Sequence, residues 1–283
     1  MTDIEIPLGK RHPLYRFFEI MPGVLSYCLI LAPFVISFFS PLIASIFVVV
    51  YIITYLVKAI ATAFRTIQGY GSLRRAQDIT WSQRLDDLKD PESALMKISR
   101  RRDDKPHRYN LEQLAMTASP RPADEIYNAV IIAAYNEGLD VIDPTIRALL
   151  ASDYDMKHII LTLAYEARDG AQSESACLAL VAKYGHNFKH AMAVKHPLTL
   201  GEVRGKGGNI TYAGRELARY VSKQGLDPDN VIVTTLDSDN KPHPQYFSYL
   251  VYEYILHPDP RHAAFQPLAL FLNNIWDVPA PMR

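Results

Sequence analysis

The chain has 283 residues, which is enough for one or two domains. Its 30 basic and 30 acidic side chains cancel to a formal net charge of zero, so nothing favours a polyanionic ligand and we expect no nucleic-acid partner. The two cysteines, Cys28 and Cys177, match no zinc-binding or redox spacing.

From Met21 to Phe64 the sequence is apolar, with Lys58 as its only charged residue. About 20 apolar residues cross a bilayer, so this stretch is long enough for two transmembrane helices. Ser40-Pro41 divides it, and proline favours the first turn of a helix. We therefore predict a hairpin of helices at roughly 22–39 and 41–64. One long signal anchor is an alternative, whereas the apolar run is too long for a cleaved signal peptide. A re-entrant hairpin is a further alternative, because the first span is short and contains Pro33.

Basic residues flank this hairpin on both sides. They are Lys10, Arg11 and Arg16 before it and Arg65, Arg74 and Arg75 after it. Because such residues favour the cytoplasmic side of a membrane, both flanks should be cytoplasmic, and two spans return the chain to its starting side. We predict an integral protein of the plasma or inner membrane whose soluble domain is cytoplasmic.

The sequence divides into four predicted parts. Residues 1–20 form a cytoplasmic N-terminal segment and residues 21–64 the hairpin. Residues 65–122 are a charged juxtamembrane region of helical pattern, which ends in the linker signal Ser119-Pro120-Arg121-Pro122. Residues 123–283 form the remaining domain.

Within that last domain, apolar strand-like runs alternate with helical patterns. The predicted strands are 126–134, 157–164, 191–195, 231–236 and 263–268, and the predicted helices are 143–150, 173–184, 208–224 and 245–256. Near-continuous apolar runs indicate strands buried on both faces. Asp143 is expected to cap its helix, Gly185 is expected to end helix 173–184 in the left-handed conformation, and Gly225 is expected to end helix 208–224. The alternation predicts an α/β fold with a mostly parallel sheet and flanking helices.

Acidic residues follow three of the predicted strands. Tyr135-Asn136-Glu137 follows the first, Glu166 and Asp169 follow the second, and Asp237-Ser238-Asp239 follows the fourth. Ligands of parallel α/β sheets bind outside the carboxyl ends of the strands. Any one of these acids is compatible with an ordinary loop or helix cap, but three together favour a site at one edge of the sheet.

Asp237 and Asp239 are separated by one residue at the end of the run V-I-V-T-T-L. Carboxylate, water and phosphate oxygens are the usual ligands of Mg²⁺ and Mn²⁺, and such an ion bridges protein and diphosphate. The alternative is a turn-capping aspartate beside a solvated one. The position at a strand end favours the metal site.

The segment Gly205-Lys206-Gly207-Gly208 precedes a predicted helix. Glycines allow the backbone to approach a ligand closely, and a helix N-terminus favours anions. The segment is neither a P-loop nor a G-x-G-x-x-G fingerprint. Alone it is compatible with a plain turn; together with the aspartates it indicates a diphosphate held between a cation and Lys206.

These residues resemble a known family in their order and spacing. Ala133-Ala134-Tyr135-Asn136-Glu137, Glu166, Gly205-Lys206-Gly207-Gly208-Asn209 and Asp237-Ser238-Asp239 are similar to four landmarks of membrane-associated family 2 glycosyltransferases. The resemblance covers about Ile126–Arg283 and implies a GT-A (Rossmann-like) domain. Ala133 stands where the family has proline, and A-Y-E-A-R-D-G stands where it has D-D-G-S.

The resemblance also implies roles for individual residues. It places Ala133, Tyr135, Glu137, Glu166, Lys206 and Asp237 at the nucleotide-sugar donor and Asp237 and Asp239 at Mg²⁺ or Mn²⁺. It implies a hexosyltransferase of polysaccharide biosynthesis. Such an enzyme transfers the sugar, with inversion, from a nucleotide-diphosphate donor to a glycan or lipid-linked acceptor hydroxyl, and the expected donor is a UDP-sugar.

The family's catalytic-base segment and its Q-x-x-R-W segment have no counterpart after Asp239. The base is therefore unknown, and we expect the GT-A domain to be incomplete at its C-terminus. Two alternatives remain: a non-catalytic membrane protein for binding or assembly, and a sugar nucleotidyltransferase.

Overall fold

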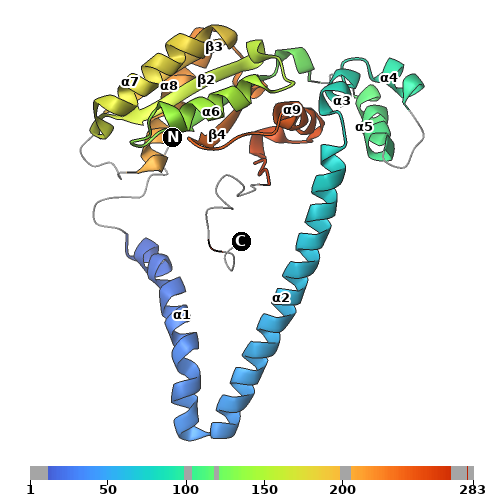
Figure 1. Cartoon of the computed structure of the whole chain (residues 1–283). Coiled ribbons are helices and arrows are strands. Elements are labelled where there is room, and N and C mark those ends of the chain that lie inside the picture. Colours follow the sequence, from blue (N-terminus) through green and yellow to red (C-terminus); the bar gives the residue numbers. More distant parts are fainter. Residues whose placement is uncertain (1–11, 99–103, 118–120, 198–204, 269–278, 280–283) are drawn as a thin grey trace. The chain divides into compact units, whose positions relative to one another are not determined.

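The computed structural model describes residues 12–98, 104–117, 121–197, 205–268 and 279 (Figure 1). Its contacts divide the chain into two compact units. The first comprises Met1–Thr80 with Thr199–Gly208, and the second comprises Trp81–Leu198 with Asn209–Arg283. The juxtamembrane region predicted for residues 65–122 therefore contributes to both units.

The first unit contains two long apolar helices, α1 (Pro13–Phe39) and α2 (Pro41–Gln77). Ser40 separates them, and its hydroxyl caps α2 by accepting a hydrogen bond from the backbone N–H of Ile43 at 3.4 Å. Both helices are long and apolar enough to cross a membrane, as predicted.

The predicted helix bounds were wrong at the outer ends of this hairpin. Helix α1 begins at Pro13 rather than near Pro22, and it runs through Pro22 and Pro33. Helix α2 continues to Gln77 rather than ending near Phe64. Apolar helices tolerate internal proline because side-chain hydroxyls and local adjustments satisfy the freed backbone groups.

The second unit is built on one sheet of four parallel strands, which confirms the α/β class. The strands are β1 (Tyr127–Ala133), β2 (Ile159–Glu166), β3 (His190–His196) and β4 (Val231–Asp237). Their order in the sheet is β3-β2-β1-β4, so β4 lies at an edge. All three neighbouring pairs are parallel.

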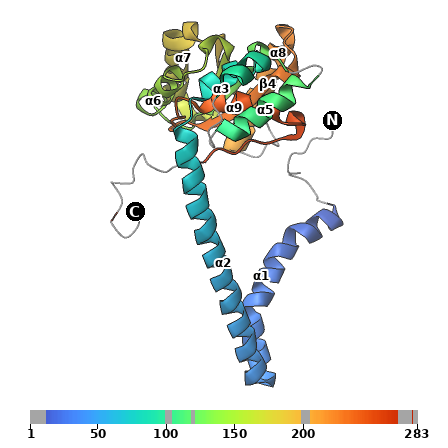
Figure 2. The same ribbon diagram turned by 90° about the vertical axis from the view of Figure 1, so that its right-hand side faces the viewer.

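Helices flank this sheet on both faces. They are α6 (Leu139–Leu150), α7 (Gly170–Tyr184), α8 (Lys206–Lys223) and α9 (Tyr246–Leu256). Figures 1 and 2 show α6 and α7 on one face of the sheet and α8 on the other. A further group of short helices belongs to the same unit: α3 (Trp81–Asp87), α4 (Pro91–Lys97) and α5 (Lys105–Ala115).

The core beneath α8 follows from strand alternation. Ala213, Leu217 and Val221 recur at helical spacing and pack onto Ala129 and Ile131 of β1 and their neighbours on β2 and β3. Because side chains alternate between the faces of a strand, every second residue of each strand points toward α8.

Two strand predictions were wrong. Residues 263–268 form no strand, since apolar composition alone does not supply a neighbouring strand for pairing. Strand β4 exists but is buried on one face only: Ile232, Thr234 and Leu236 are buried, whereas Val233 is 55% exposed. The reason is its edge position: the buried strand residues of the core beneath α8 come from β1, β2 and β3, and β4 adds only the half-buried Val231.

Two capping predictions were also wrong. Asp143 lies inside α6 rather than at its start, where it pairs with Lys183 at 3.1 Å and also contacts Arg147. Gly185 has a φ of −57° and leads into a short 3₁₀ turn, so it is not left-handed. Gly225 does follow the end of α8 closely, as predicted, and its φ of 66° is left-handed.

Candidate functional site

The candidate site lies at the carboxyl edge of the sheet, where β1, β2 and β4 end side by side. Ala133, the last residue of β1, is paired in register with Asp237 of β4 on one side and Ala164 of β2 on the other. Glu166 follows Ala164 by two residues. Strand alternation therefore directs Ala133, Asp237 and Glu166 to the same face of the sheet, the face that α8 covers.

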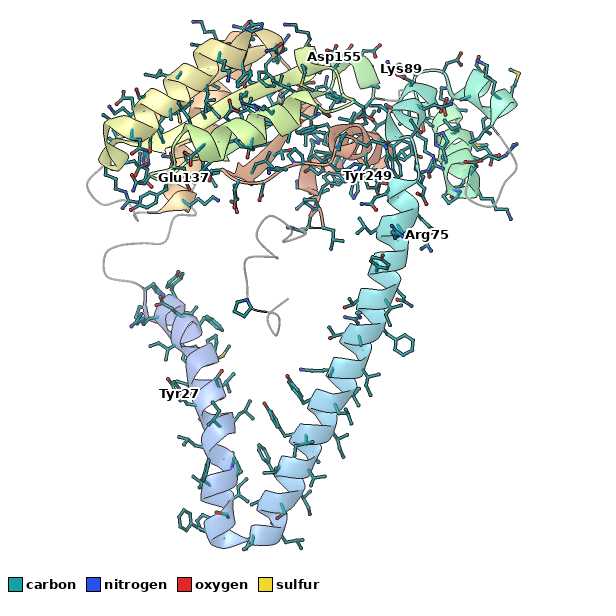
Figure 3. The ribbon with its side chains drawn as sticks, viewed as in Figure 1. Tyr27, Arg75, Lys89, Glu137, Asp155 and Tyr249 are labelled. Carbon is teal, nitrogen blue, oxygen red and sulfur yellow. The ribbon has the colours of Figure 1, made fainter. Side chains whose placement is uncertain are left out.

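The turn after β1 is held in a specific conformation. Asn136 has a φ of 61°, a left-handed value that asparagine adopts more readily than most residues. Glu137 is labelled in Figure 3. Its carboxylate folds back and accepts a hydrogen bond from the backbone N–H of Tyr135. Its other oxygen accepts a hydrogen bond from the Ser238 hydroxyl at 3.1 Å. This turn is thus joined directly to the loop after β4.

The loop after β4 exposes both aspartates and buries the serine between them. Asp237 and Asp239 are exposed, while Ser238 is buried. The Ser238 carbonyl accepts a hydrogen bond from the buried Thr145 hydroxyl of α6 at 2.7 Å. The backbone N–H of Asn240 closes a turn onto the Asp237 carbonyl at 3.1 Å. These hydrogen bonds hold the backbone of the turn in place, while the side chains of both aspartates stay exposed.

Glu166 is buried and is already paired with a cation. Its carboxylate accepts two hydrogen bonds from Arg168, the longer one at 3.0 Å, which is the fork geometry of an arginine–carboxylate pair. The Arg168 guanidinium also lies over the ring of Tyr135, 5.1 Å from its centroid. The predicted residues Tyr135 and Glu166 are therefore connected through Arg168, which the sequence analysis did not single out.

Asp169 is a second acid at this end of β2. One of its oxygens accepts the Glu166 backbone N–H at 2.9 Å, and the other is buried without a hydrogen-bond partner among the described residues. Burial raises the pKa of the Asp169 carboxyl, while the hydrogen bond from Glu166 opposes that rise. The buried Ser173 hydroxyl in the first turn of α7 also has no partner in the described part of the chain. Buried polar atoms are normally paired, so these two are candidates for ligand contact.

Asn209 stabilises the ends of the two central strands. Its side-chain amide donates to the carbonyls of Ala164 at 3.1 Å and Ala134 at 3.4 Å, and the side chain is 2% exposed. The residue belongs to the glycine-lysine segment noted in the sequence. Its bridging role was not predicted, because no local pattern indicates a contact with residues 45 and 75 positions away.

Lys206 is the first residue of α8, so the Gly-Lys segment opens a helix as predicted, and that helix begins two residues before the predicted start at Gly208. Lys206 belongs to the first compact unit and Asp237 to the second. Their approach to a shared diphosphate stays a prediction.

The residues at this edge suit a cation that is coordinated mainly by water and substrate phosphates. Within the described residues no three His, Cys, Asp or Glu side chains form a ready-made metal site. Mg²⁺ commonly uses one or two carboxylates and completes its coordination with water and substrate phosphates. Two exposed carboxylates on a fixed turn, Asp237 and Asp239, match that chemistry.

Comparison with known proteins gives no match to a family model and no match to a curated protein. The functional proposal below therefore rests on the residues of this chain and their arrangement.

Proposed function

We propose that this chain is a membrane-bound, inverting glycosyltransferase that takes its sugar from a nucleotide-diphosphate donor, with UDP-sugar the expected class. The observation that carries the proposal is the hydrogen bond between Ser238 and Glu137, which joins the acidic loop after β4 to the Tyr135–Glu137 turn at the carboxyl edge of a parallel sheet. This edge is where nucleotides bind in α/β folds.

The proposed roles divide the edge into two halves. Asp237 and Asp239 hold Mg²⁺ or Mn²⁺, and this ion would bind the diphosphate. Ala133, Tyr135, Glu137 and Glu166 line the nucleotide, and Asp169 adds a buried carboxyl to that half. The exposed ring of Tyr135, backed by Arg168, offers a flat surface to a base.

The chemistry follows from these roles. The bound cation would neutralise charge on the departing diphosphate as a Lewis acid. The acceptor, a glycan or lipid-linked hydroxyl, must lose a proton to a general base, and no residue is assigned to that step. The proposal therefore assigns the donor half of the reaction to named residues.

Calorimetry of UDP binding to the detergent-solubilised full chain, with and without Mn²⁺, tests the proposal. We expect metal-dependent binding that is lost in the Asp237→Asn/Asp239→Asn double variant. Asp227→Asn/Asp229→Asn is the matched control, since it removes two acids of the same spacing at the other end of β4. This control should bind UDP with Mn²⁺ as the native chain does.

Other results would favour the alternatives. Equal binding by the native chain and the Asp237/Asp239 variant would refute the metal assignment. Binding of UTP with release of pyrophosphate on adding a sugar phosphate would indicate a nucleotidyltransferase. Metal-dependent UDP binding without sugar transfer to any glycan or lipid acceptor would favour a non-catalytic binding protein.

A further inference from the structure

The uncharged part of helix α2 ends at one cationic residue, Lys58. Lys58 is the only charged residue between Ile20 and Phe64. Within the part of the chain that the structure describes, its ammonium group has no ion pair or hydrogen bond. An ionisable side chain in an apolar helix is costly unless it reaches a partner, which makes Lys58 a candidate binding residue.

The depth of Lys58 can be read from the lengths of the two helices. The uncharged arms of the hairpin, Ile20–Phe39 and Pro41–Val57, are about 30 Å and about 26 Å long at the usual helical rise. The hydrocarbon core of a bilayer is about 30 Å thick. Glu19 and Lys58 flank these arms at the ends that lie away from the Ser40 turn. The two residues thus mark the same membrane boundary. Lys58 therefore lies at the level of the lipid headgroups.

Polar residues continue from Lys58 along one face of α2. Tyr51, Tyr55, Lys58 and Thr62 recur at intervals of four, three and four residues, so they form one polar stripe. Ala44, seven residues before Tyr51, lies on the same face and is the buried residue of α2. From Tyr51 onward the stripe is exposed. Figure 3 shows the two helices together at their turn and apart beyond it.

A shallow groove follows this stripe at the level of Lys58. Its walls include Tyr55, Lys58, Thr62 and Thr66, and the small side chains of Ala59 and Ala63 leave room between them. The two threonine hydroxyls donate to helix carbonyls at 2.9 Å. The ammonium of Lys58 and the hydroxyl of Tyr55 are then the donors that the groove can offer to a ligand.

We propose that this groove binds the phosphate headgroup of an anionic membrane lipid, with Lys58 and Tyr55 donating hydrogen bonds to the phosphate oxygens. Charge and depth both support a lipid phosphate, because headgroups occupy this level and attract cations beside a membrane span. The nearest acid at the same depth, Glu19, is paired with Arg16 at 2.6 Å. Arg65, seven residues beyond Lys58, extends the positive charge along the same face.

This inference requires that α2 crosses a membrane, but it does not depend on glycosyl transfer. Native mass spectrometry of the detergent-solubilised full chain, titrated with phosphatidylglycerol or phosphatidylcholine, tests it. We expect preferential retention of phosphatidylglycerol by the native chain. Lys58→Leu should reduce that retention about fivefold, the effect of one cation at a membrane surface. Tyr55→Phe should reduce it about twofold through the lost hydrogen bond.

Two variants control for charge and folding. Arg74→Leu removes one cation from the same helix, where Arg74 lies over Tyr70, and should retain phosphatidylglycerol as the native chain does. Lys58→Arg should restore retention, which separates lipid binding from a folding defect. We expect metal-dependent UDP binding to stay unchanged in the same variants. The two measurements therefore test the lipid site and the proposed glycosyltransferase function separately.

Several results would overturn the proposal. Equal losses in Lys58→Leu and Arg74→Leu would indicate a general charge effect. Inorganic phosphate that competes as well as lipid would remove the assignment to a membrane lipid. A dimer that dissociates in Lys58→Leu, with lipid adducts unchanged, would identify a second protein chain as the occupant of the groove.

Discussion

The Ser238 hydroxyl donates a hydrogen bond to the Glu137 carboxylate at 3.1 Å, although 101 residues separate the two in the sequence. Both residues lie at the carboxyl edge of the sheet, one after β1 and one after β4. Because Glu137 also accepts the Tyr135 backbone N–H, a single carboxylate organises the turn after β1 and fixes it to the acidic loop. In the proposed function this contact aligns the nucleotide half of the site with the diphosphate half.

The first prediction tests that alignment. Ser238→Ala should weaken metal-dependent UDP binding about tenfold, because a hydrogen bond to a charged group contributes about 1.5 kcal/mol or more. Calorimetry measures the change. Ser222→Ala, an exposed serine on α8, is the matched control and should leave binding unchanged. Equal affinities for the native chain and Ser238→Ala would mean that the two loops act independently.

The second prediction concerns the buried amide of Asn209. Asn209→Asp replaces a donor with a carboxylate that faces the carbonyl oxygens of Ala134 and Ala164. We expect a loss of about 3 kcal/mol in the free energy of unfolding, measured by urea denaturation in detergent. Asn230→Asp makes the same chemical change at a half-buried surface position, where the amide donates to Glu125 at 3.3 Å, and should cost less than Asn209→Asp because solvent screens the added charge. Similar losses in both variants would contradict the bridging role.

The sheet could be predicted from the sequence because buried strands appear as short apolar runs. The runs that became β1 and β2 are almost continuously apolar, which is typical of strands covered on both faces. Strand β4 has a similar β-branched composition, yet Val233 is largely exposed. Which strand lies at the edge depends on the order of strands in the sheet, and the composition of a single strand does not encode that order.

The candidate site shows the same division. Asp237, Asp239 and Glu137 were found because acids after apolar strands are visible locally. The contacts of Ser238, Arg168 and Asn209 were not predicted. Their hydrogen-bond partners become neighbours only in the folded chain, so no sequence pattern indicates them. Asp169 was noted only as a residue after the second strand, and its burial with an unpaired oxygen became apparent once β2 and α7 were in place.

The third prediction follows from His107, which lies buried between α5, α3 and α9. A neutral imidazole satisfies both neighbours: Nε2–H donates to Asp87 at 3.0 Å, and Nδ1 accepts from the Tyr252 hydroxyl at 2.9 Å. Burial lowers the pKa of His107, while the hydrogen bond to Asp87 opposes this, and Arg84 and Asp104 act as smaller charges nearby.

The sign of the pH effect follows from proton binding. An unfolded histidine has a pKa of about 6.5. Below that pH the unfolded chain binds a proton that folded His107 does not, so stability should fall as the pH drops from 6.5 toward the lower folded pKa. Above about 6.5 this group should add no pH dependence.

Denaturation at pH values between 5 and 8 measures this dependence. His107→Gln should flatten the decline below pH 6.5 and should lower stability by about 1–3 kcal/mol throughout. His190 is also partly buried with a lowered pKa, so it contributes with the same sign. His190→Gln is therefore the companion variant, and it should leave the contribution of His107 in place. An unchanged decline in His107→Gln would assign the pH dependence to other groups.

The fourth prediction uses Trp81, the first residue of α3, as a probe of the acidic loop. Its backbone N–H donates to the Gln245 side chain at 2.5 Å, and its ring stacks on Tyr249 with centroids 3.9 Å apart. Gln245 ends the loop that begins at Ser238, and the preceding Pro244 carbonyl accepts hydrogen bonds from Ser152 and Asp153. A change at the aspartates should therefore reach Trp81 through Gln245.

We expect UDP with Mn²⁺ to change the fluorescence of Trp81, measured in a Trp276→Phe background because the sequence has two tryptophans. Gln245→Ala should abolish the change in fluorescence while calorimetric binding weakens by no more than about fivefold, the effect of one hydrogen bond. Gln245→Glu keeps an acceptor oxygen for the Trp81 N–H and should restore the signal. A full fluorescence response in Gln245→Ala would show that Trp81 senses the ligand by another route. Loss of calorimetric UDP binding in all of these variants would mean that Gln245 is needed for the structure of the loop after β4, rather than for coupling that loop to α3.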